Sequence, residues 1–529
     1  MAYHLERHPK MRAVINFVPV LLDQLEDYTD QFATGRPRDP LLRLLIHENS
    51  CDLSTAQRQL ALDACFRSEH SKMISPFPAY KRLLELYARL QADGEIALSY
   101  LSGQYVADLL TWYHLAWCGE SVRREHSLVA RLMSKAEGFS YEDRKQLHDL
   151  IGELISGIIP RYRKLAEAGQ IEISSTPHYH PLAPLLIDFA SAKEAMPDVP
   201  LPESPHYPKG RSRVTEHIRR AKSSHRERFG AEPQGMWPAE GSISTETLEV
   251  FASEGCRWVA SGEGVLVNSL RHIQQPVPER AQYLYRPYRL NHGADGLSCF
   301  FRDDRLSDLI GFEYSRWHGK EAAQHFIDQL EAIAEHAPGN ETPVVSIILD
   351  GENAWEYYPY NGFYFLDELY NGLEAHTGIH TNTYSDYLKS SASNKRSAKA
   401  CSLPGIVAGS WVYGNFSTWI GSKDKNRAWD LLCVAKQSFD MVMSSGRLSP
   451  AEQVAAENQL CSCESSDWFW WFGDYNPSTS VASFDRLFRH DLTVLYRLLK
   501  LPPPITLAEP VSQGGGHPEA GGAMRRASE

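Results

Sequence analysis

The sequence predicts an α/β protein with a mainly parallel sheet, and the number of strand–helix units favours a barrel. Three observations predict this. Short apolar strands alternate with helical patterns through the middle of the chain. A long, mostly helical stretch interrupts that alternation at about 40–168. After about residue 380 strands become rare and helical patterns dominate.

The expected strands are short apolar runs, each bounded by polar or turn residues. They cover residues 12–17, 171–173, 234–237, 257–260, 297–301 and 344–349. The run 344–349 is apolar except for Ser346, which is typical of a strand buried on both faces. A short helix is expected before residue 9, because Pro9 ends the pattern that opens the chain.

The expected helices have apolar residues at spacings of three and four. In the insertion they cover residues 79–90, 96–118 and 141–168, in the barrel 214–229, 245–254 and 319–337, and near the C-terminus 425–443, 449–460 and 484–499. We therefore divide the chain into a catalytic barrel at 1–380, which includes the insertion, and a helical region at 381–505 that completes the active site. Residues 506–529, with three consecutive glycines, are expected to lack structure.

Composition restricts the class of partner. The chain has 529 residues, of which 43% are hydrophobic and 23% charged, and its formal net charge is 54 − 66 = −12. An acidic protein is a poor ligand for nucleic acid or for an anionic membrane surface, whereas a neutral substrate suits it. No apolar run reaches the roughly 18 residues of a membrane span, and the first residues are polar.

The nine cysteines are scattered, and none forms a pair with metal-binding spacing. We interpret them as buried or free thiols. Together with the absence of an apolar leader, this predicts a reduced, cytoplasmic protein.

The sharpest chemical motif follows the expected strand 344–349. Asp350 comes directly after it, and Gly351, Glu352 and Asn353 continue the motif. Active sites of α/β folds lie at the carboxyl ends of strands, so Asp350 stands where a catalytic acid would stand. The structural alternative is an aspartate that caps the next helix.

A second motif surrounds Glu240. Trp237 ends an expected strand, Pro238 stops it, and Glu240 follows just beyond the strand end. Glu240 is a candidate nucleophile, and Trp237 a candidate platform for a sugar ring. The alternative is a glutamate in the first turn of the next helix, stabilised by the helix dipole.

Two further motifs are rich in polar and aromatic groups. His178 and His180 follow the expected strand at 171–173. We expect them to form hydrogen bonds with substrate hydroxyls. The alternatives are a structural loop and a metal site, although no third metal ligand is evident. Near the C-terminus, Asp467 precedes five consecutive aromatic residues that include Trp470. Aromatic faces stack on sugar rings, although packing of a helix on the barrel would also use them.

Taken together, these motifs resemble glycoside hydrolase family 57, the family of α-amylases, amylopullulanases, 4-α-glucanotransferases and some branching enzymes. The resemblance reaches to about residue 500 and rests on an ordered set of segments: 169–173 with His180, 235–240, 349–353 and 467–471. It implies an incomplete (β/α)7 barrel followed by a helical region. It also implies that Glu240 is the nucleophile, that Asp350 is the general acid/base, and that the chemistry needs no metal or other cofactor.

The N-terminus departs from the family pattern. That pattern begins with a barrel strand that carries His-Gln-Pro, whereas this sequence begins in what resembles the following helix. We therefore expect the first barrel strand and its histidine to be missing from this chain.

The resemblance predicts a retaining glycosidase that acts on α-glucans or maltooligosaccharides, in which His178, His180 and Trp237 position the sugar. Weaker candidates for the same role are Glu352, Asn353, Trp411, Asp467 and Trp470. An amylase-type hydrolase is favoured over a 4-α-glucanotransferase or a branching enzyme, and over another glycosidase such as a mannosidase. A non-catalytic glucan-binding protein is the alternative of a different class.

Overall fold

The computed structural model describes residues 1–92, 100–273, 277–290, 296–339, 341–351, 354–391 and 396–516. In these residues one sheet of seven strands has the order β1-β2-β3-β4-β6-β5-β7. The strands are β1 Ala13–Phe17, β2 Ile171–Ser175, β3 Gly235–Met236, β4 Trp258–Ser261, β5 Tyr288–Leu290, β6 Ser298–Phe301 and β7 Cys401–Leu403. An α/β fold with an incomplete barrel is thereby confirmed, because the sheet is open, with β1 and β7 at its edges.

Five strands run parallel, from β1 through β2, β3 and β4 to β6. Only β5 is antiparallel to its neighbour β6, and β7 then runs parallel to β5. The carboxyl ends of the five parallel strands therefore meet at one edge of the sheet, where an α/β enzyme builds its active site.

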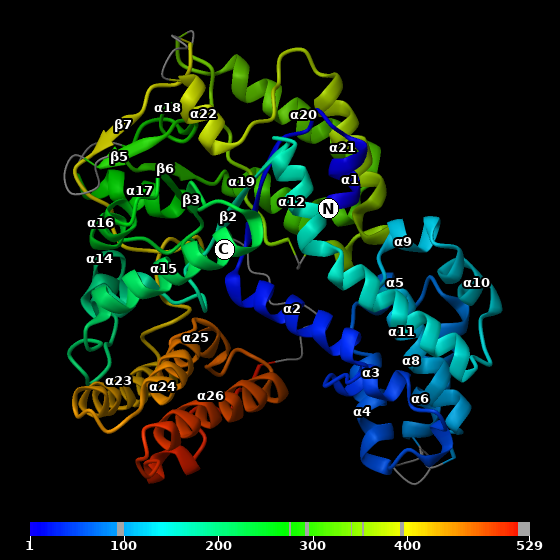
Figure 1. Ribbon diagram of the computed structural model, residues 1–529. Helices are drawn as coiled ribbons and strands as arrows, with labels where there is room; N and C mark the ends of the chain where they lie inside the picture. The colour runs from blue at the N-terminus through cyan, green and yellow to red at the C-terminus, as the bar shows by residue number, and fades with distance from the viewer. Residues whose placement is uncertain are drawn as a thin grey trace.

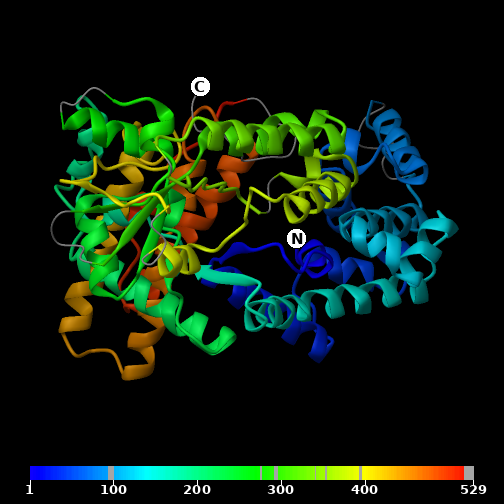
Figure 2. The same ribbon diagram turned by 90° about the horizontal axis from the view of Figure 1, so that it is seen from above.

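Helices cover the sheet. Their bounds are α1 Ala2–Arg7, α12 Ile158–Glu167, α13 Ala183–Ile187, α14 Ala192–Ala195, α15 Gly210–Phe229, α16 Thr245–Ser253, α17 Glu263–His272, α18 Arg280–Tyr283, α19 Asp304–Asp308, α20 Gly319–Glu335 and α21 Phe363–Ala375. Helices α20 and α21 lie side by side at one end of the sheet, close to α1 (Figures 1 and 2). Buried leucine, isoleucine, valine and aromatic side chains from helices and strands form one large core.

The insertion forms a helical lobe with a hydrophobic core of its own. Its helices are α2 Pro19–Thr34, α3 Pro40–Leu45, α4 Thr55–Cys65, α5 His70–Met73, α6 Pro78–Ala92, α8 Gly103–Trp117, α9 Glu120–Glu125, α10 Ser127–Lys135 and α11 Tyr141–Ser156. The stretch expected as one helix at 141–168 is two, α11 and α12, separated at Gly157. Figure 1 shows this lobe in blue and cyan, with α2 leading into it from the sheet.

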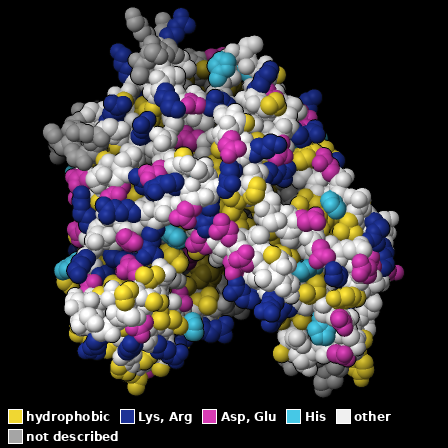
Figure 3. Space-filling model, viewed as in Figure 1, with side chains coloured by type: hydrophobic (Ala, Val, Ile, Leu, Met, Phe, Trp, Pro, Cys, Tyr) yellow, Lys and Arg dark blue, Asp and Glu magenta, His cyan; other side chains and the backbone are white. Residues whose placement is uncertain are grey.

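The C-terminal region consists of α23 Lys423–Ser444, α24 Pro450–Cys463, α25 Asp467–Trp471 and α26 Ser478–Leu498. Ser449 begins α24 with a capping box, in which its hydroxyl accepts from the Glu452 amide and the Glu452 carboxylate accepts from the Ser449 amide. On the face seen in Figure 3, the surface is deeply hollowed between this region and the insertion lobe, and hydrophobic side chains lie in the hollow.

A small helix, α22 Tyr384–Ser391, closes the inner face of the open sheet. The Tyr384 ring stacks on Phe300 of β6 at 4.2 Å between ring centroids and contacts Trp258 of β4 at 4.6 Å. Glu172 of β2 accepts hydrogen bonds from the Ser385 amide and from Trp258 Nε1. The same apolar cluster includes Val14 from β1 and Ile348. Side chains from α22 therefore fill the interior that a closed sheet would enclose.

Three expectations from the sequence need correction. Residues 344–349 form no regular strand: only Ser346 bridges to Arg302, and the apolar side chains around it are half-buried rather than fully buried. The short strands β5 and β7 were not expected. Residues 505–516, mostly expected to lack structure, contain a helical turn and pack against the body through Val511 and Ser512, because Asp485 Oδ1 accepts from both amides.

All nine cysteines are free thiols. Within the described ranges, no helix is both long enough and apolar enough to cross a membrane.

Candidate active site

Glu240 lies at the carboxyl edge of the sheet, in a tight turn after β3. The turn Ala239–Gly241 holds Glu240 in the left-handed region, with φ 57° and ψ 26°. A non-glycine residue there costs on the order of 1 kcal/mol and persists only when its surroundings impose it. The interpretation of Glu240 as a first-turn glutamate is wrong, since the next helix begins at Thr245 with Ser244 as its cap.

Trp411 fixes Glu240 through two hydrogen bonds. Its indole Nε1 donates to Glu240 Oε2 at 3.0 Å, and its amide donates to the Glu240 carbonyl at 3.1 Å. One residue thus holds the backbone and the carboxylate of Glu240 together. The sequence named Trp411 only as a weak candidate, because its contact with Glu240 spans 171 positions along the chain.

Two tryptophans and two glycines shape the space around this carboxylate. Trp237 packs edge-to-face on Trp411, with ring centroids 5.4 Å apart. A Cβ on Gly241 would lie 2.8 Å from the Trp237 ring, and one on Gly262 would lie 2.5 Å from Trp411 Cα. Both positions therefore require glycine for the indoles to approach the Glu240 turn so closely.

Arg302 connects the Glu240 turn to the segment that ends at Asp350. Its guanidinium lies 5.2 Å from the Trp411 ring centroid, and its Nε donates to the Ile348 carbonyl at 2.8 Å. The remaining nitrogens bind Asp304 and Asp308. Burial raises the pKa of Asp304 to about 7, against the opposing charge of Arg302. Arg302 was not expected from the sequence, although its place directly after the apolar run of β6 is a signal that could have found it.

Asp350 is half-buried at the end of the extended segment that Arg302 and the Ser307 hydroxyl hold in place. It does not cap a helix, because the next helical turn, Trp355–Tyr357, has Ala354 at its N-cap. Glu352 and Asn353, which the sequence proposed as sugar contacts, lie outside the described residues.

His178 and His180 lie in a strained loop after β2. Tyr179 and His180 both have positive φ, 61° and 56°. His178 Nε2 lies 3.0 Å from Asp23 Oδ2, and His180 Nδ1 lies 2.7 Å from the Ser466 hydroxyl. Burial lowers the pKa of His180, while the charge of Asp467 opposes this. The structure thus brings His180 next to the Ser466–Asp467 turn, which is remote in sequence.

Most of the aromatic residues at 468–472 pack in the protein interior. Phe469 stacks on Trp429 at 3.9 Å with an interplanar angle of 7°, and Trp468, Phe469 and Phe472 are buried. Trp470 is half-buried against Trp419, with centroids 5.7 Å apart, and Asp467 is exposed at the start of α25. Helix packing therefore explains the buried members, whereas Asp467 is exposed and Trp470 half-buried.

Two groups of side chains among the described residues have the composition of a metal site. In the first, His217, Cys461 and Glu464, Arg213 donates to both the thiol sulfur and the carboxylate, so a cation already occupies the position. The second comprises His4, His8 and Asp367, and Arg7 lies 3.7 Å from the carboxylate there. Neither group includes a residue of the Glu240–Asp350 edge.

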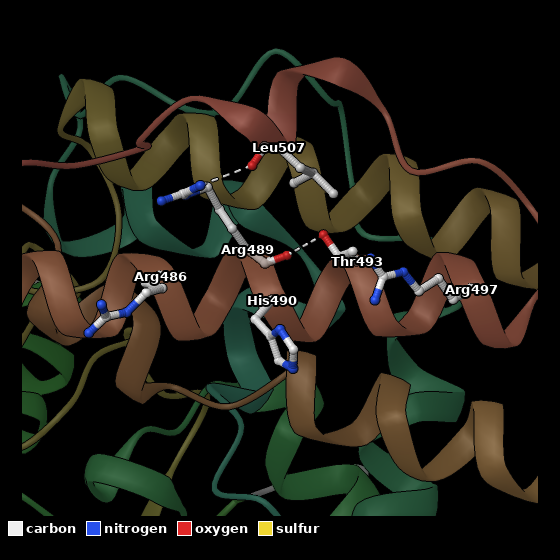
Figure 4. Close-up of a pocket in the computed structure, with 6 residues that line it drawn as sticks. All are labelled: Arg486, Arg489, His490, Thr493, Arg497 and Leu507. Atoms are coloured by element: carbon white, nitrogen blue, oxygen red, sulfur yellow. Dashed lines mark hydrogen bonds between the residues drawn. The ribbon is translucent and has the colours of Figure 1, made fainter.

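A pocket on the outer surface of α26 is chemically different. Its lining is basic, and Figure 4 shows that the side chains of Arg486, His490 and Arg497 do not point to a common centre. Arg489 is already occupied by the Leu507 carbonyl. None of the candidate site residues lines this pocket.

With this geometry established, comparison with known proteins gives the family. The sequence matches glycosyl hydrolase family 57 over residues 20–401, which is more than half of the chain. The chain belongs to glycoside hydrolase family 57. A search of curated proteins finds no significant match.

Solved structures, among them two family 57 branching enzymes, share the fold at low identity. A family 57 branching enzyme from Thermococcus kodakaraensis is 14% identical, with a TM-score of 0.53 over 92% of this chain and 89% of its own. The branching enzyme from Pyrococcus horikoshii is also 14% identical, with a TM-score of 0.52 over 100% and 92%. The α-amylase AmyC from Thermotoga maritima is 12% identical, with a TM-score of 0.53 over 94% and 85%.

Family membership makes this protein an enzyme of the glycoside hydrolase type, a type that includes enzymes transferring sugars between glycans. The matched range contains both motif segments at the sheet edge, with Glu240 and Asp350, and ends before Trp411. The contact by which Trp411 orients Glu240 is thus contributed from outside the matched range.

Proposed function

We propose that this family 57 enzyme acts on α-glucans by a retaining, double-displacement mechanism, with Glu240 as nucleophile and Asp350 as general acid/base. The observation that carries the proposal is the Glu240 turn at the carboxyl edge of the sheet, where Trp411 orients the carboxylate. Arg302 supports the proposal, because it joins this turn to the segment that presents Asp350.

In the first step Glu240 attacks the anomeric carbon, and the bond to the leaving glucosyl oxygen breaks as Asp350 gives that oxygen a proton. The product is a covalent glycosyl-enzyme. In the second step Asp350 takes a proton from water or from a sugar hydroxyl, whose oxygen attacks the anomeric carbon and releases Glu240. We propose that the sugar is held by His178, His180, Trp237, Asp467 and Trp470. The cytoplasmic location expected from the sequence stays a prediction.

The acceptor in the second step decides between two activities. Water gives an amylase-type hydrolase, the activity that we favour from the sequence. A sugar hydroxyl gives a glucanotransferase or branching enzyme, and two of the structurally similar proteins are branching enzymes whereas one is an amylase. Because these proteins share so little sequence with this chain, their similarity shows a common fold and does not decide between the two activities.

The experiment incubates the purified protein with maltoheptaose and with amylose, and follows reducing ends, chain lengths and isoamylase-sensitive branches. Hydrolysis adds one reducing end for each bond broken, so we expect reducing ends to rise as chains shorten. Constant reducing ends with redistributed chain lengths would assign transfer instead, and new isoamylase-sensitive branches would assign branching. Unchanged glucans despite measurable binding would contradict an enzyme acting on α-glucans.

A second prediction concerns Trp411. In Trp411→Phe the ring remains but the indole N–H to Glu240 is lost. A hydrogen bond to a charged group contributes about 1.5–3 kcal/mol, so we expect kcat to fall roughly 10- to 100-fold while KM changes little. Steady-state kinetics on maltoheptaose provide the measurement, and Trp117→Phe, an exposed tryptophan of the insertion lobe, is the control. Equal kcat in Trp411→Phe and wild type would show that the indole does not orient a catalytic group.

A further inference from the structure

A buried charged cluster lies behind the loop that carries His178 and His180. Its centre is Glu464, at the C-terminal end of α24, with no exposed surface. Glu464 Oε1 accepts from Tyr207 Oη at 2.6 Å and from Arg213 Nε at 2.8 Å. Glu464 Oε2 accepts from Arg213 Nη2 at 2.9 Å and lies 2.8 Å from His217 Nε2. All four oxygen lone-pair positions of this carboxylate are therefore used.

A buried cluster of charges contributes little net stability to a fold. Taking charges out of water costs several kcal/mol for each ion, and well-packed apolar residues of similar volume often stabilise a protein equally well. Although burial raises it, the charges of Arg213 and His217 hold the pKa of Glu464 below its ordinary value. A second carboxylate, Glu457, also pairs with Arg213. This balanced arrangement keeps the cluster ionised and its geometry fixed.

His217, on α15, connects the cluster to the loop. The His178 amide donates to the His217 carbonyl at 3.0 Å, and His217 Nδ1 contacts the His178 carbonyl. One buried residue therefore holds both polar backbone groups of His178, while its other ring nitrogen faces Glu464. This repeats the way in which Trp411 holds Glu240.

The far end of the loop is fixed from the same place. Ser466, two residues after Glu464, donates its amide to the His180 carbonyl at 3.0 Å, and its hydroxyl lies 2.7 Å from His180 Nδ1. Between these anchors, Tyr179 and His180 have positive φ, which costs on the order of 1 kcal/mol for each non-glycine residue. The loop is thus held in a conformation that it would not adopt alone.

We propose that His217 is a positioning residue that, through its contact with the His178 carbonyl, sets the place of His178 and His180 at the sugar site. The inference rests on the proposed function, because it assigns a purpose to two histidines that we expect to contact substrate. Placement matters in such a site, since a displacement of about 1 Å can cost on the order of 100-fold in rate.

Two substitutions of His217 separate its two contacts. In His217→Gln the amide nitrogen takes the place of Nε2, which keeps the bond to Glu464 and loses the one to the His178 carbonyl. In His217→Asn the amide nitrogen takes the place of Nδ1, which keeps the loop contact and loses Glu464. We expect kcat/KM on maltoheptaose to fall roughly 10- to 100-fold in His217→Gln and less than about fivefold in His217→Asn.

Tyr207→Phe is the matched control. It removes a buried hydrogen bond to the same carboxylate, since the Tyr207 hydroxyl donates to Glu464 rather than to the loop. We expect it to lower the thermal midpoint about as much as His217→Gln while kcat/KM stays within about twofold of wild type. If kcat/KM instead followed the thermal midpoint across the three variants, His217 would be a structural residue only, and the proposal would be overturned.

A double-mutant cycle tests whether His217 affects activity through the His178 side chain. In a His178→Ala background we expect the loss caused by His217→Gln to shrink to about threefold or less, because the side chain being positioned is absent. Fully additive losses would overturn the proposal. A crystal structure of His217→Gln should show residues 177–181 displaced, and an unmoved loop would also overturn it. This structural result is independent of whether wild-type protein turns over α-glucans, which tests the proposed function separately.

Discussion

In Glu240→Gln, turnover of maltooligosaccharides falls by at least about 10⁴-fold, which corresponds to about 5 kcal/mol of lost transition-state stabilisation. An amide is a very poor nucleophile, so the covalent route closes. Gln keeps the size of Glu and an oxygen that accepts from Trp411 Nε1, so we expect the turn and the thermal midpoint to persist.

The control for this substitution is Glu246→Gln. Glu246 is an exposed glutamate in the first turn of α16, only six positions further along the chain. We expect this variant to keep wild-type kinetics on maltoheptaose. Near-normal turnover in Glu240→Gln, measured on protein shown to be folded by circular dichroism, would remove Glu240 from the mechanism.

Asp350→Ala has the second largest expected effect. We expect turnover of maltoheptaose to fall by about 10²- to 10⁴-fold, the usual contribution of general acid/base catalysis. Glycosyl fluorides should be affected much less in the first step, because fluoride departs without a proton. Azide should then attack the glycosyl-enzyme without base assistance and yield a glycosyl azide of retained configuration, which mass spectrometry and NMR detect.

Asp328→Ala, at an exposed position of α20, is the matched control and should behave as wild type without any response to azide. Absence of a glycosyl azide, combined with equal losses on glycosyl fluoride and maltoheptaose, would assign the acid/base role to a different residue.

Local sequence patterns were sufficient for much of this fold. The parallel strands β1, β2, β3, β4 and β6 all lie where short apolar runs predicted them, because burial in a parallel sheet demands such runs. Pairing of β5 with β6 and β7 was not predictable in the same way, since three-residue strands such as Cys401–Leu403 carry almost no periodic signal.

The segment 344–349 illustrates the opposite error. Its apolar run suggested a central strand, but only Ser346 bridges to a neighbour, and residues such as Val344 and Ile348 instead pack into the cluster with α22. Neither α22 nor its place inside the open sheet was expected from the sequence. The apolar run was therefore predicted to be buried as a central strand, whereas it packs against α22.

Contacts between remote residues explain what was missed in the candidate site. Trp411 and Glu240 are 171 positions apart, and His217 and Glu464 are 247 apart. Arg213 and Glu464 occur in polar helical segments, where charged residues are usually solvated, yet both are buried. Only the fold reveals that these charges meet behind the His178 loop.

The most direct test of the account is to trap the intermediate on the enzyme. A 5-fluoro-α-glucosyl fluoride should accumulate a covalent adduct, because the ring fluorine slows both steps while the fluoride leaving group speeds the first, so that the second step becomes limiting. Peptide mapping by mass spectrometry should then place one fluoroglucosyl group on Glu240, with none on the Glu240→Gln protein. A label on any other residue, or turnover of the reagent without an adduct on Glu240, would contradict the assignment of Glu240 as the nucleophile.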